Sequence, residues 1–413
     1  MNIIVLILVA LMGLASSVNA AGFRLADQDA KATGMGNAYT AVADNASAVW
    51  YNPAAITNLE GTNVSLGTVM IAPSMEHKNT NGTTDEIEST LHIPPHFYAT
   101  HKLNDQWSLG FGVNAPFGLS TEWDPATANT RTVATKSEVK AINANLNGAY
   151  KLNDKFSFAA GVDYVTLDAT LNKMIVAPAN ALYAGSPAIN EEQTLEGDGT
   201  GMGYNAAVMY KHNDKLQFGA NYHSQVKINV DGKINLMPTS GVVSAARATN
   251  QDAETELTLP DLFQVGAAYK YSDKWLFSAE ADYTNWTTYR RIIIDYTKDN
   301  GAAAQSIDNK NWESTWAFRL GTEYKYSETL KFRGGTFYDM NPVKEEYFET
   351  RVPDSDRVAF AIGAGWNKNN VTVDVSYMYL MFLEREVDSA TASLDGKYNS
   401  VAHLPAITVG YKF

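Results

Sequence analysis

The sequence predicts an all-β protein, a 14-stranded antiparallel transmembrane β-barrel whose N-terminal segment is small enough to lie in the lumen as a hatch. Three observations predict this fold. After the first two dozen residues no apolar run approaches the roughly 18 residues of a membrane helix, and mean hydropathy is −0.24. Long stretches alternate between apolar and polar residues, as strands with two unlike faces do. A turn phrase, "KLNDKFSF" from Lys151 with five similar copies, recurs between these stretches.

Residues 1–20 have the features of a signal peptide. Ile3 to Leu14 is an apolar run, and Val18, Asn19 and Ala20 supply the small, spaced residues of a signal-peptidase site. We therefore expect export and cleavage after Ala20. The stretch before the apolar run has no Lys or Arg, and a short membrane anchor is the alternative interpretation, although the run falls short of a span of about 20 residues.

The composition excludes several classes of function. The chain has no cysteine, so it forms no disulfide, thiol nucleophile or thiolate metal site. A formal net charge of −13 opposes nucleic-acid binding, which needs a basic face. Phosphate-loop, nucleotide-fold and zinc patterns are absent, and we expect no cofactor and no metal. The 22 Tyr, 16 Phe and 8 Trp residues suit the aromatic girdles of a membrane barrel.

Residues 21–58 do not alternate and are rich in Ala and Gly. Asn52 can cap a short helix and Pro53 can start it, because a proline at the first helical position loses no needed hydrogen bond. A segment of this length fits inside a medium-sized barrel, whereas the barrels of about 22 strands hold larger plugs. We assign residues 21–58 to a hatch and residues 59–413 to the barrel.

The alternating stretches have one apolar and one polar face. In the stretch from Lys140, Ile142 and Leu146 alternate with an amide row of Asn143, Asn145 and Asn147. A soluble sandwich and a membrane barrel both show alternation, but many stretches here run ten to twenty residues, against about 5–6 in soluble strands. Length therefore favours a barrel with the amides in its lumen.

The recurring phrase predicts the turns at one end of the barrel. Asn or Ser followed by Asp, Glu or Asn forms tight turns, since these short side chains bond their own backbone. Variable spacing between copies indicates long loops at the other end, as in outer-membrane barrels. The predicted strands begin near Gly61, Thr90, Gln106, Lys136, Lys155, Gly201, Lys215, Glu254, Lys274, Asn311, Thr329, Asp356, Asn370 and Lys397.

Four stretches resemble one family. They are "AGF" at the mature start, "GMGNAYTAVADNASAVWYNPA", "VPDSDR" before a late strand, and the terminal strand ending at Phe413. Together they resemble the FadL family of outer-membrane long-chain fatty acid transporters, and "NAPFGL" also resembles its aromatic hydrocarbon-uptake relatives. The resemblance implies a hatch-plugged barrel, energy-independent uptake of hydrophobic molecules, and a lateral exit through a gap in the wall.

The third predicted strand contains a proline where the family has an inward kink. Proline cannot donate to a strand ladder, so Pro116 indicates a bulge or broken pairing. An early end of the strand at a loop is the alternative. We expect the hatch residues Asn52, Pro53 and Ala54 to face this kink. The predicted lateral gate comprises Asn114, Ala115, Pro116, Phe117 and Gly118.

The resemblance also suggests ligand-binding residues. Phe23 matches a family phenylalanine that reaches the inner pocket, with a disordered terminal residue as the alternative. Trp50 and Tyr51 are candidates for the same pocket, with hatch packing as the alternative for both. Lys173 and Lys310 are the candidate cations for a carboxylate, with solvated loop lysines as the alternative. The matching place on the fifth strand holds Asp168, which favours uncharged hydrocarbon cargo.

The motif "PDSDR" supplies Pro353, Asp354, Asp356 and Arg357. We expect Asp356 and Arg357 to pair in the lumen, with a salt bridge at the barrel rim as the alternative.

The sequence therefore predicts a passive outer-membrane channel of a Gram-negative bacterium that takes up long-chain fatty acids. An aromatic hydrocarbon channel and a general polar porin are the alternatives. An enzyme is not expected, because His223 and Ser224 adjoin in a strand and point to opposite faces. Expected partners are the hydrophobic cargo, outer-membrane lipid and lipopolysaccharide, and the barrel-assembly machinery through Phe413. The family resemblance favours a monomer.

Overall fold

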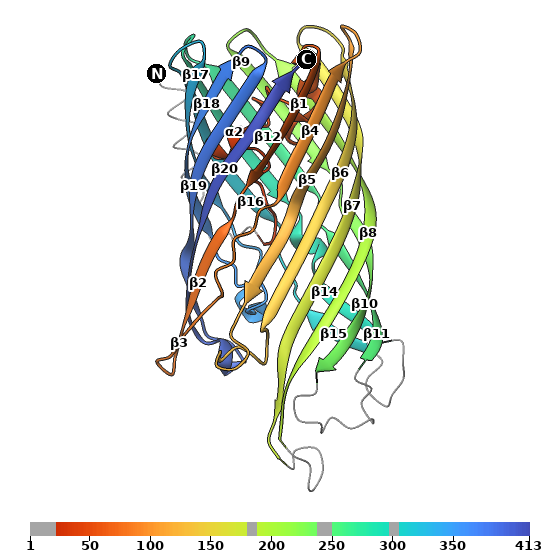
Figure 1. Cartoon of the computed structure of the whole chain (residues 1–413), viewed down its shortest axis with the longest axis vertical. Coiled ribbons are helices and arrows are strands. Elements are labelled where there is room, and N and C mark those ends of the chain that lie inside the picture. Colours follow the sequence, from red (N-terminus) through yellow and green to blue (C-terminus); the bar gives the residue numbers. More distant parts are fainter. Residues whose placement is uncertain (1–21, 180–187, 238–249, 297–304) are drawn as a thin grey trace.

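The barrel closes on itself through its first and last strands. In the computed structural model, which describes residues 22–179, 188–237, 250–296 and 305–413, β20 (Gly396–Lys412) pairs antiparallel with both β1 (Thr62–Val69) and β19 (Val371–Val387). Short turns connect the strands at one end, at the top of Figure 1, and longer connections lie at the other end. Closure removes every free sheet edge from this part of the wall, as a membrane-spanning sheet requires.

The described residues build fourteen barrel strands, as predicted. Nine strands are continuous: β4 (Pro95–Lys102), β5 (Trp107–Glu122), β6 (Lys136–Lys151), β7 (Phe156–Ala177), β8 (Ile189–Lys211), β17 (Leu330–Asp339), β18 (Arg357–Lys368), β19 and β20. Five are interrupted: β1 with β2 (Ala72–Asn79), β9 (Leu216–His223) with β10 (Val226–Met237), β11 (Asn250–Leu259) with β12 (Leu262–Lys270), β13 (Trp275–Thr284) with β14 (Arg291–Tyr296), and β15 (Gln305–Asn309) with β16 (Thr315–Lys325). A short β3 (Thr84–Glu86) pairs with β2.

Some predicted boundaries were wrong. The sixth strand was expected near Gly201 but begins at Ile189, because the β7–β8 ladder continues as far as the pair Ala177↔Ile189. Glycines at alternate positions in this stretch hid the strand pattern. The second strand was expected near Thr90 but begins at Pro95, after the loop that follows β3.

The two faces of the wall follow the predicted alternation. Asn143, Asn145 and Asn147 are each 1% exposed and face the lumen, whereas Leu146 between them is 54% exposed on the outer face. The amide row is hydrogen-bonded: Asn143 and Asn145 both donate to the carboxylate of Asp163 on β7, at 3.1 and 2.6 Å. The polar residues therefore form an internal network, and the apolar residues face lipid.

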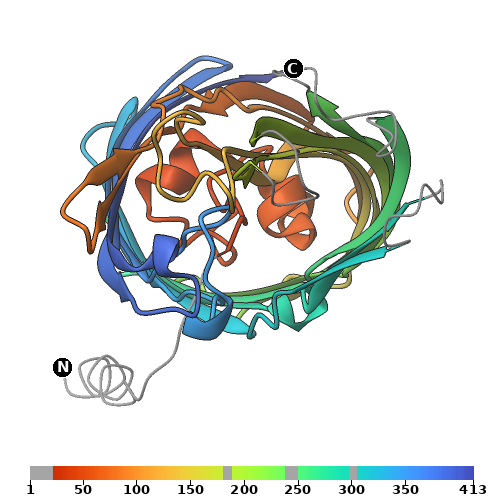
Figure 2. The same ribbon diagram turned by 90° about the horizontal axis from the view of Figure 1, so that it is seen from below.

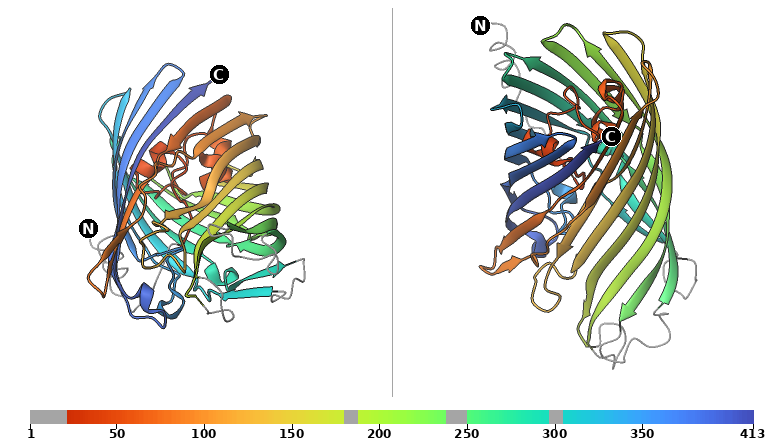
Figure 3. Two further views of the ribbon diagram at one scale, coloured as in Figure 1. Left: turned by 60° about the horizontal axis from the view of Figure 1, so that its bottom comes forward. Right: turned by 45° about the horizontal axis from the view of Figure 1, so that its top comes forward.

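Residues 22–58 lie inside the barrel, where Figures 2 and 3 show them as the red segment in the lumen. They form α2 (Ala30–Gly34), α3 (Ala48–Tyr51) and the short helix η1 (Pro53–Asn58). Asn52 caps η1 by accepting from the Ala54 N–H at 3.1 Å, as its position before Pro53 predicted. No helix among these described residues is long and apolar enough to cross a bilayer.

Buried ion pairs attach this hatch to the wall. Lys31 of α2 lies 2.6 Å from Asp44 and 3.4 Å from Glu323 on β16. Glu323 also pairs at 2.9 Å with Arg333, which binds Asp374 at 2.6 Å. Because removing one partner of a buried pair leaves a charge without compensation, this chain of charges holds the hatch in one position.

Gly335 on β17 marks a place where the hatch backbone touches the wall. A Cβ at Gly335 would lie 2.2 Å from the backbone of Met35 and Gly36, whereas one at the adjacent Gly334 meets nothing closer than 3.8 Å. We expect Gly335→Ala to displace the hatch and to raise single-channel conductance in planar bilayers. Gly334→Ala is the matched control and should conduct like the wild type. Equal conductance in all three proteins would contradict this contact.

The N-cap carboxyl of α2 links hatch stability to pH. Burial, reinforced by the nearby Asp374 carboxylate, raises the pKa of Asp29 to about 6. Since an unfolded Asp titrates near 3.9, the folded protein holds the proton more tightly between these values, and stability decreases as pH rises from about 4 to about 6.

Asp29→Asn keeps the cap but has no carboxyl to titrate. We therefore expect the unfolding free energy of this variant to fall by about 3 kcal/mol less than that of the wild type as pH rises. Urea unfolding in lipid vesicles between pH 4 and pH 7 measures the difference. Parallel pH profiles for the two proteins would contradict the assignment to Asp29.

Candidate functional site

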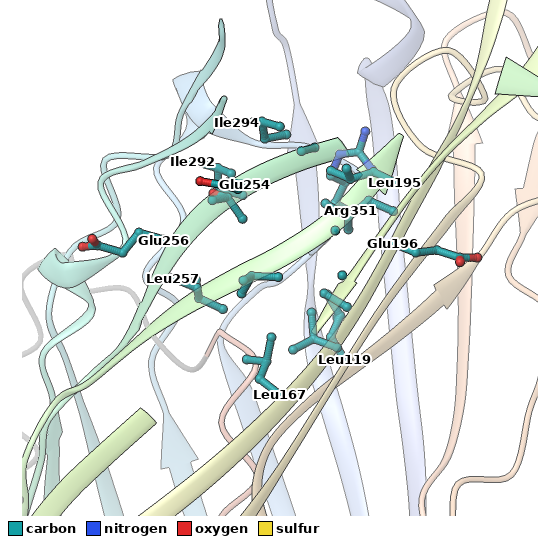
Figure 4. A pocket seen from close by; sticks show the side chains of 18 of the residues that line it. Leu119, Leu167, Leu195, Glu196, Glu254, Glu256, Leu257, Ile292, Ile294 and Arg351 are labelled. Atoms are coloured by element: carbon teal, nitrogen blue, oxygen red, sulfur yellow. The ribbon is translucent and has the colours of Figure 1, made fainter. Parts of the chain in front are cut away.

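An apolar cavity of about 80 Å³ lies in the lumen (Figure 4). We call it the inner cavity. Its apolar lining comes mainly from β5, β6, β7, β8, β10, β11 and β14 and includes Phe23, Leu119, Val139, Leu167, Leu171, Leu195, Val230, Leu257, Ile292 and Ile294. The carboxylates of Glu196 and Glu256 point away from it in Figure 4. The cavity thus suits an apolar molecule.

One cation, Arg351, lines the inner cavity. Its Nε lies 3.7 Å from Glu349, and its buried Nη1 has no hydrogen-bond partner among the described residues. A buried donor without a hydrogen-bond partner destabilises the folded protein. A bound acceptor, such as a carboxylate, would therefore form a favourable hydrogen bond with this guanidinium.

The wall is irregular at the predicted kink. The β5–β6 register shifts between Asn114 and Phe117, so that β5 carries one residue more than β6. On its other side β5 pairs with β4 only as far as Val113, opposite Phe97. Beyond Val113, up to a single bridge from Ile87 to Trp123, no wall strand among the described residues pairs with this side of β5. In Figure 1, β2 and β5 diverge there.

A second cavity, of about 560 Å³, passes through this region, and we call it the side cavity. It begins at Phe23 and Leu25 in the lumen and extends to residues on the outer face, namely Lys140, Ile142 and Asp168. Phe23 lines both the inner and the side cavity. Leu119, Val139 and Val352 also line both cavities, so the two cavities adjoin at these four residues.

The N-terminal segment fills part of the gap by pairing with the kink. Leu25 N donates to Pro116 O at 2.8 Å, and Gly118 N donates to Phe23 O at 3.0 Å. The Gln28 side chain donates to Ala115 O at 2.9 Å and accepts from Ala115 N at 3.2 Å. The kink leaves backbone N–H and C=O groups of β5 without a partner in the neighbouring wall strand. The N-terminal segment, rather than the wall, supplies their hydrogen bonds.

Comparison with known proteins identifies the family. The model of the family described as "Outer membrane protein transport protein (OMPP1/FadL/TodX)" matches residues 11–413. The chain belongs to this family. It is accordingly an outer-membrane transport protein of a Gram-negative bacterium. The resemblance to the FadL family that the sequence motifs indicated is confirmed.

Individual members of the OMPP1/FadL/TodX family are similar along most of the chain. A long-chain fatty acid transport protein of Escherichia coli O6:H1 is 28% identical over 397 residues, 87% of each chain. A 47 kDa outer membrane protein of Pasteurella multocida is 28% identical and covers 98% of this chain and 97% of its own.

Two solved structures share the fold. A Pseudomonas aeruginosa FadL homologue is 19% identical with a TM-score of 0.83, covering 95% of this chain and 100% of its own. The Ralstonia pickettii toluene transporter TbuX is 16% identical with a TM-score of 0.72, covering 93% and 98%.

Of the predicted cations, neither lines a described cavity. Lys310 is 1% exposed and is held between the carboxylates of Asp308 and Glu349. Lys173 on β7 lies within electrostatic range of Arg351 and Asp308 and lines neither the inner nor the side cavity. Sequence reasoning missed Arg351, although it stands directly before the motif "VPDSDR" and so could have been noticed.

The predicted hatch motif does not face the kink. Asn52 donates to Thr40 O at 2.9 Å and to Val208 O at 3.2 Å, and Val208 belongs to β8, three strands along the wall from β5. Because Asn52 caps η1, it turns toward the wall that η1 packs against, and Gln28 contacts the kink instead. Pro53 and Ala54 are buried within the hatch packing.

Trp50 and Tyr51 pack the hatch and line neither cavity. The Trp50 ring lies 4.2 Å from the ring of His223, and the Tyr51 hydroxyl accepts from Gln28 N at 2.9 Å and donates to Ala26 O at 3.0 Å. These contacts agree with the alternative role, hatch packing.

The late motif holds Gly22, the first residue that the structure describes. Asp354 accepts from Gly22 N at 2.6 Å, and Arg357 Nη2 donates to Gly22 O at 3.3 Å. The expected pair of Asp356 with Arg357 does not form: Arg357 lies 4.0 Å from Asp354, and Asp356 accepts from the Tyr338 hydroxyl. Pro353 lines the side cavity.

Proposed function

We propose that the protein is a passive channel through which hydrophobic molecules, chiefly long-chain fatty acids, enter by lateral diffusion through the kinked wall at β5. The observation that carries this proposal is that the inner cavity and the side cavity adjoin at Phe23, which lines both, and that the side cavity extends to the outer face. Cargo that displaces the Phe23 ring reaches the side cavity. Each methylene kept out of water contributes about 0.8 kcal/mol, which favours such a path over an aqueous pore.

Charges in the lumen beside Phe23 support a lateral rather than an axial route. Arg24 and Arg319 both lie 3.0 Å from Asp282, and all three side chains are nearly inaccessible to solvent. Apolar cargo moving along the axis would have to separate these ions, and breaking a buried pair costs about 3–5 kcal/mol. The side cavity is lined mainly by apolar residues, although Arg24, Asp27 and Arg357 also border it.

Arg351 supports a carboxylate-bearing cargo. It is the cation on the inner cavity wall, and the similar proteins of E. coli and other enterobacteria are long-chain fatty acid transport proteins. An aromatic hydrocarbon is the second candidate, favoured by the otherwise apolar lining and by the similarity in fold to toluene transporters. A general polar porin agrees less well with a lumen occupied by a hydrogen-bonded hatch.

The same architecture supports the remaining proposals about partners. We propose a non-enzymatic monomer, surrounded by outer-membrane lipid and lipopolysaccharide. Phe413, which is 71% exposed beyond the end of β20, is available to the barrel-assembly machinery.

Uptake in a Gram-negative host lacking its own fatty-acid channel tests the proposed function. Cells producing the full chain receive labelled oleate or labelled toluene in parallel. Oleate uptake above that of cells without the protein supports the fatty-acid channel, and toluene uptake alone makes it a hydrocarbon channel. Uptake of neither, with large open-channel currents in planar bilayers, would overturn the lateral route in favour of a porin.

A further inference from the structure

The outer face of β6 changes from apolar to charged along its length. Leu146 and Ile142 are 54% and 37% exposed on this face. The next outward side chains toward the long loops are those of Lys140, Glu138 and Lys136. Charged side chains on the lipid face of a barrel are tolerated near the interface and are destabilising at the centre of the bilayer. The edge of the hydrocarbon layer therefore crosses β6 between Ile142 and Lys140.

The side cavity opens across this edge. Its lining includes Ile142 on the apolar side and Lys140 and Glu138 on the charged side. Asp168 on β7 is the direct partner of Lys140 in the β6–β7 ladder, and it lines the cavity as well. A molecule that leaves the cavity here therefore meets the hydrocarbon and the polar layer at the same place.

The opposite side of the opening is apolar. It is formed by the segment between β3 and β4, which is attached beside β2 where Ile71 and His92 exchange both backbone hydrogen bonds, at 2.8 and 2.9 Å. On either side of His92, Leu91 and Ile93 are 52% and 56% exposed, and both line the side cavity. An alkyl chain thus finds apolar surface on both sides of the opening.

Lys140 is free to exchange its ion-pair partner. Its Nζ lies 2.8 Å from Glu138, but 60% of the Lys140 side chain is exposed, and exposed ion pairs contribute little to stability. It is the one lysine among the described residues that line the side cavity. A carboxylate that arrives through the cavity can replace Glu138 and form a charge-assisted hydrogen bond. Glu138 and Asp168 compete for the same ammonium group, so the carboxylate is held weakly and can leave.

We propose that Lys140 is a carboxylate-binding site at the lateral exit, where it holds the head of a long-chain fatty acid while the alkyl chain passes Ile142 into the hydrocarbon layer. An ionised carboxylate is costly inside hydrocarbon, and at Lys140 it stays in the polar layer. The inference rests on the proposed function and adds the residue that receives the acid after Arg351. Charged and neutral cargo therefore differ in how they leave the protein.

Uptake of labelled oleate and labelled methyl oleate by the same cells tests this site, because the two molecules share one alkyl chain and only oleate is charged. Lys140→Gln is expected to lower the maximal rate of oleate uptake about tenfold, since it removes a charge-assisted hydrogen bond. The half-saturating concentration, which the inner cavity sets, should not change, and neither should methyl oleate uptake. Lys140→Arg should restore the oleate rate.

Lys136→Gln is the matched control for a lysine on the same face of the same strand. Lys136 lies 3.3 Å from Glu122 and does not line the side cavity, so this variant should take up both molecules like the wild type. Oleate uptake that Lys140→Gln leaves unchanged, or that Lys136→Gln lowers equally, would overturn the inference.

Labelling with the N-hydroxysuccinimide ester of oleic acid measures binding without transport. The lysine amine attacks the ester carbonyl, an amide bond forms, and N-hydroxysuccinimide leaves with the amine proton. In lipid vesicles, mass spectrometry should find Lys140 modified about ten times as often as Lys136, and excess oleate, but not methyl oleate, should remove the difference. Equal modification of the two lysines would overturn the inference. Selective modification of Lys140 in a protein that takes up no oleate would overturn the proposed function alone.

Discussion

Deletion of Pro116 is expected to reduce uptake of labelled oleate to the level of cells without the channel, while the barrel remains folded. Between the pairs Asn114↔Asn143 and Phe117↔Ala141, β5 carries one extra residue. Removing one residue restores a regular ladder without turning the following side chains to the other face, since their partners stay the same. A straight β5 loses the inward displacement that opens the side cavity.

The matched control keeps the extra residue. Pro116→Ala leaves the residue count, and therefore the bulge, unchanged, and it should transport oleate like the wild type. Both proteins are checked for folding by the electrophoretic mobility shift on heating that barrels show. Wild-type uptake by folded protein lacking Pro116 would mean that cargo does not cross the wall at β5.

Local chemistry made much of the architecture predictable. The repeated Asn-Asp and Ser-Asp turns fixed where strands meet, as when Asn153 Oδ1 accepts from the N–H groups of Lys155 and Phe156. Pro116 indicated the bulge for an equally local reason, because a proline cannot donate to the ladder. Signals of this kind need no knowledge of the rest of the fold.

Features that depend on distant partners were not predictable in the same way. Gly22 is held by Asp354, 332 residues away in the sequence, and Gln28 reaches Ala115 across 87 residues. The inner wall that Asn52 faces is likewise set by how η1 packs, not by its neighbours in sequence. These contacts form only when the barrel closes and brings distant segments together. For the same reason the sequence did not show that Arg351, rather than Lys310, is the cation on the wall of the inner cavity.

Arg351→Gln is expected to lower oleate uptake about tenfold or more at limiting concentration, since a hydrogen bond to a charged group contributes roughly 1.5–3 kcal/mol. Toluene uptake should not change, because an uncharged ring has no carboxylate to lose. The variant should fold, since Glu349 keeps its pairing with Lys310. Initial rates with the two labelled substrates, taken over a range of concentrations, give the comparison.

Lys344→Gln is the control for charge alone. Lys344 lies outside the cavity in the loop after β17, where it pairs with Glu313 at 2.8 Å, and its loss changes the net charge by the same amount as Arg351→Gln. If the two variants impair oleate uptake equally, the effect is one of net charge in the lumen and not of a carboxylate site. If Arg351→Gln impairs both substrates equally, Arg351 shapes the cavity for either cargo, and the fatty-acid assignment loses its main support.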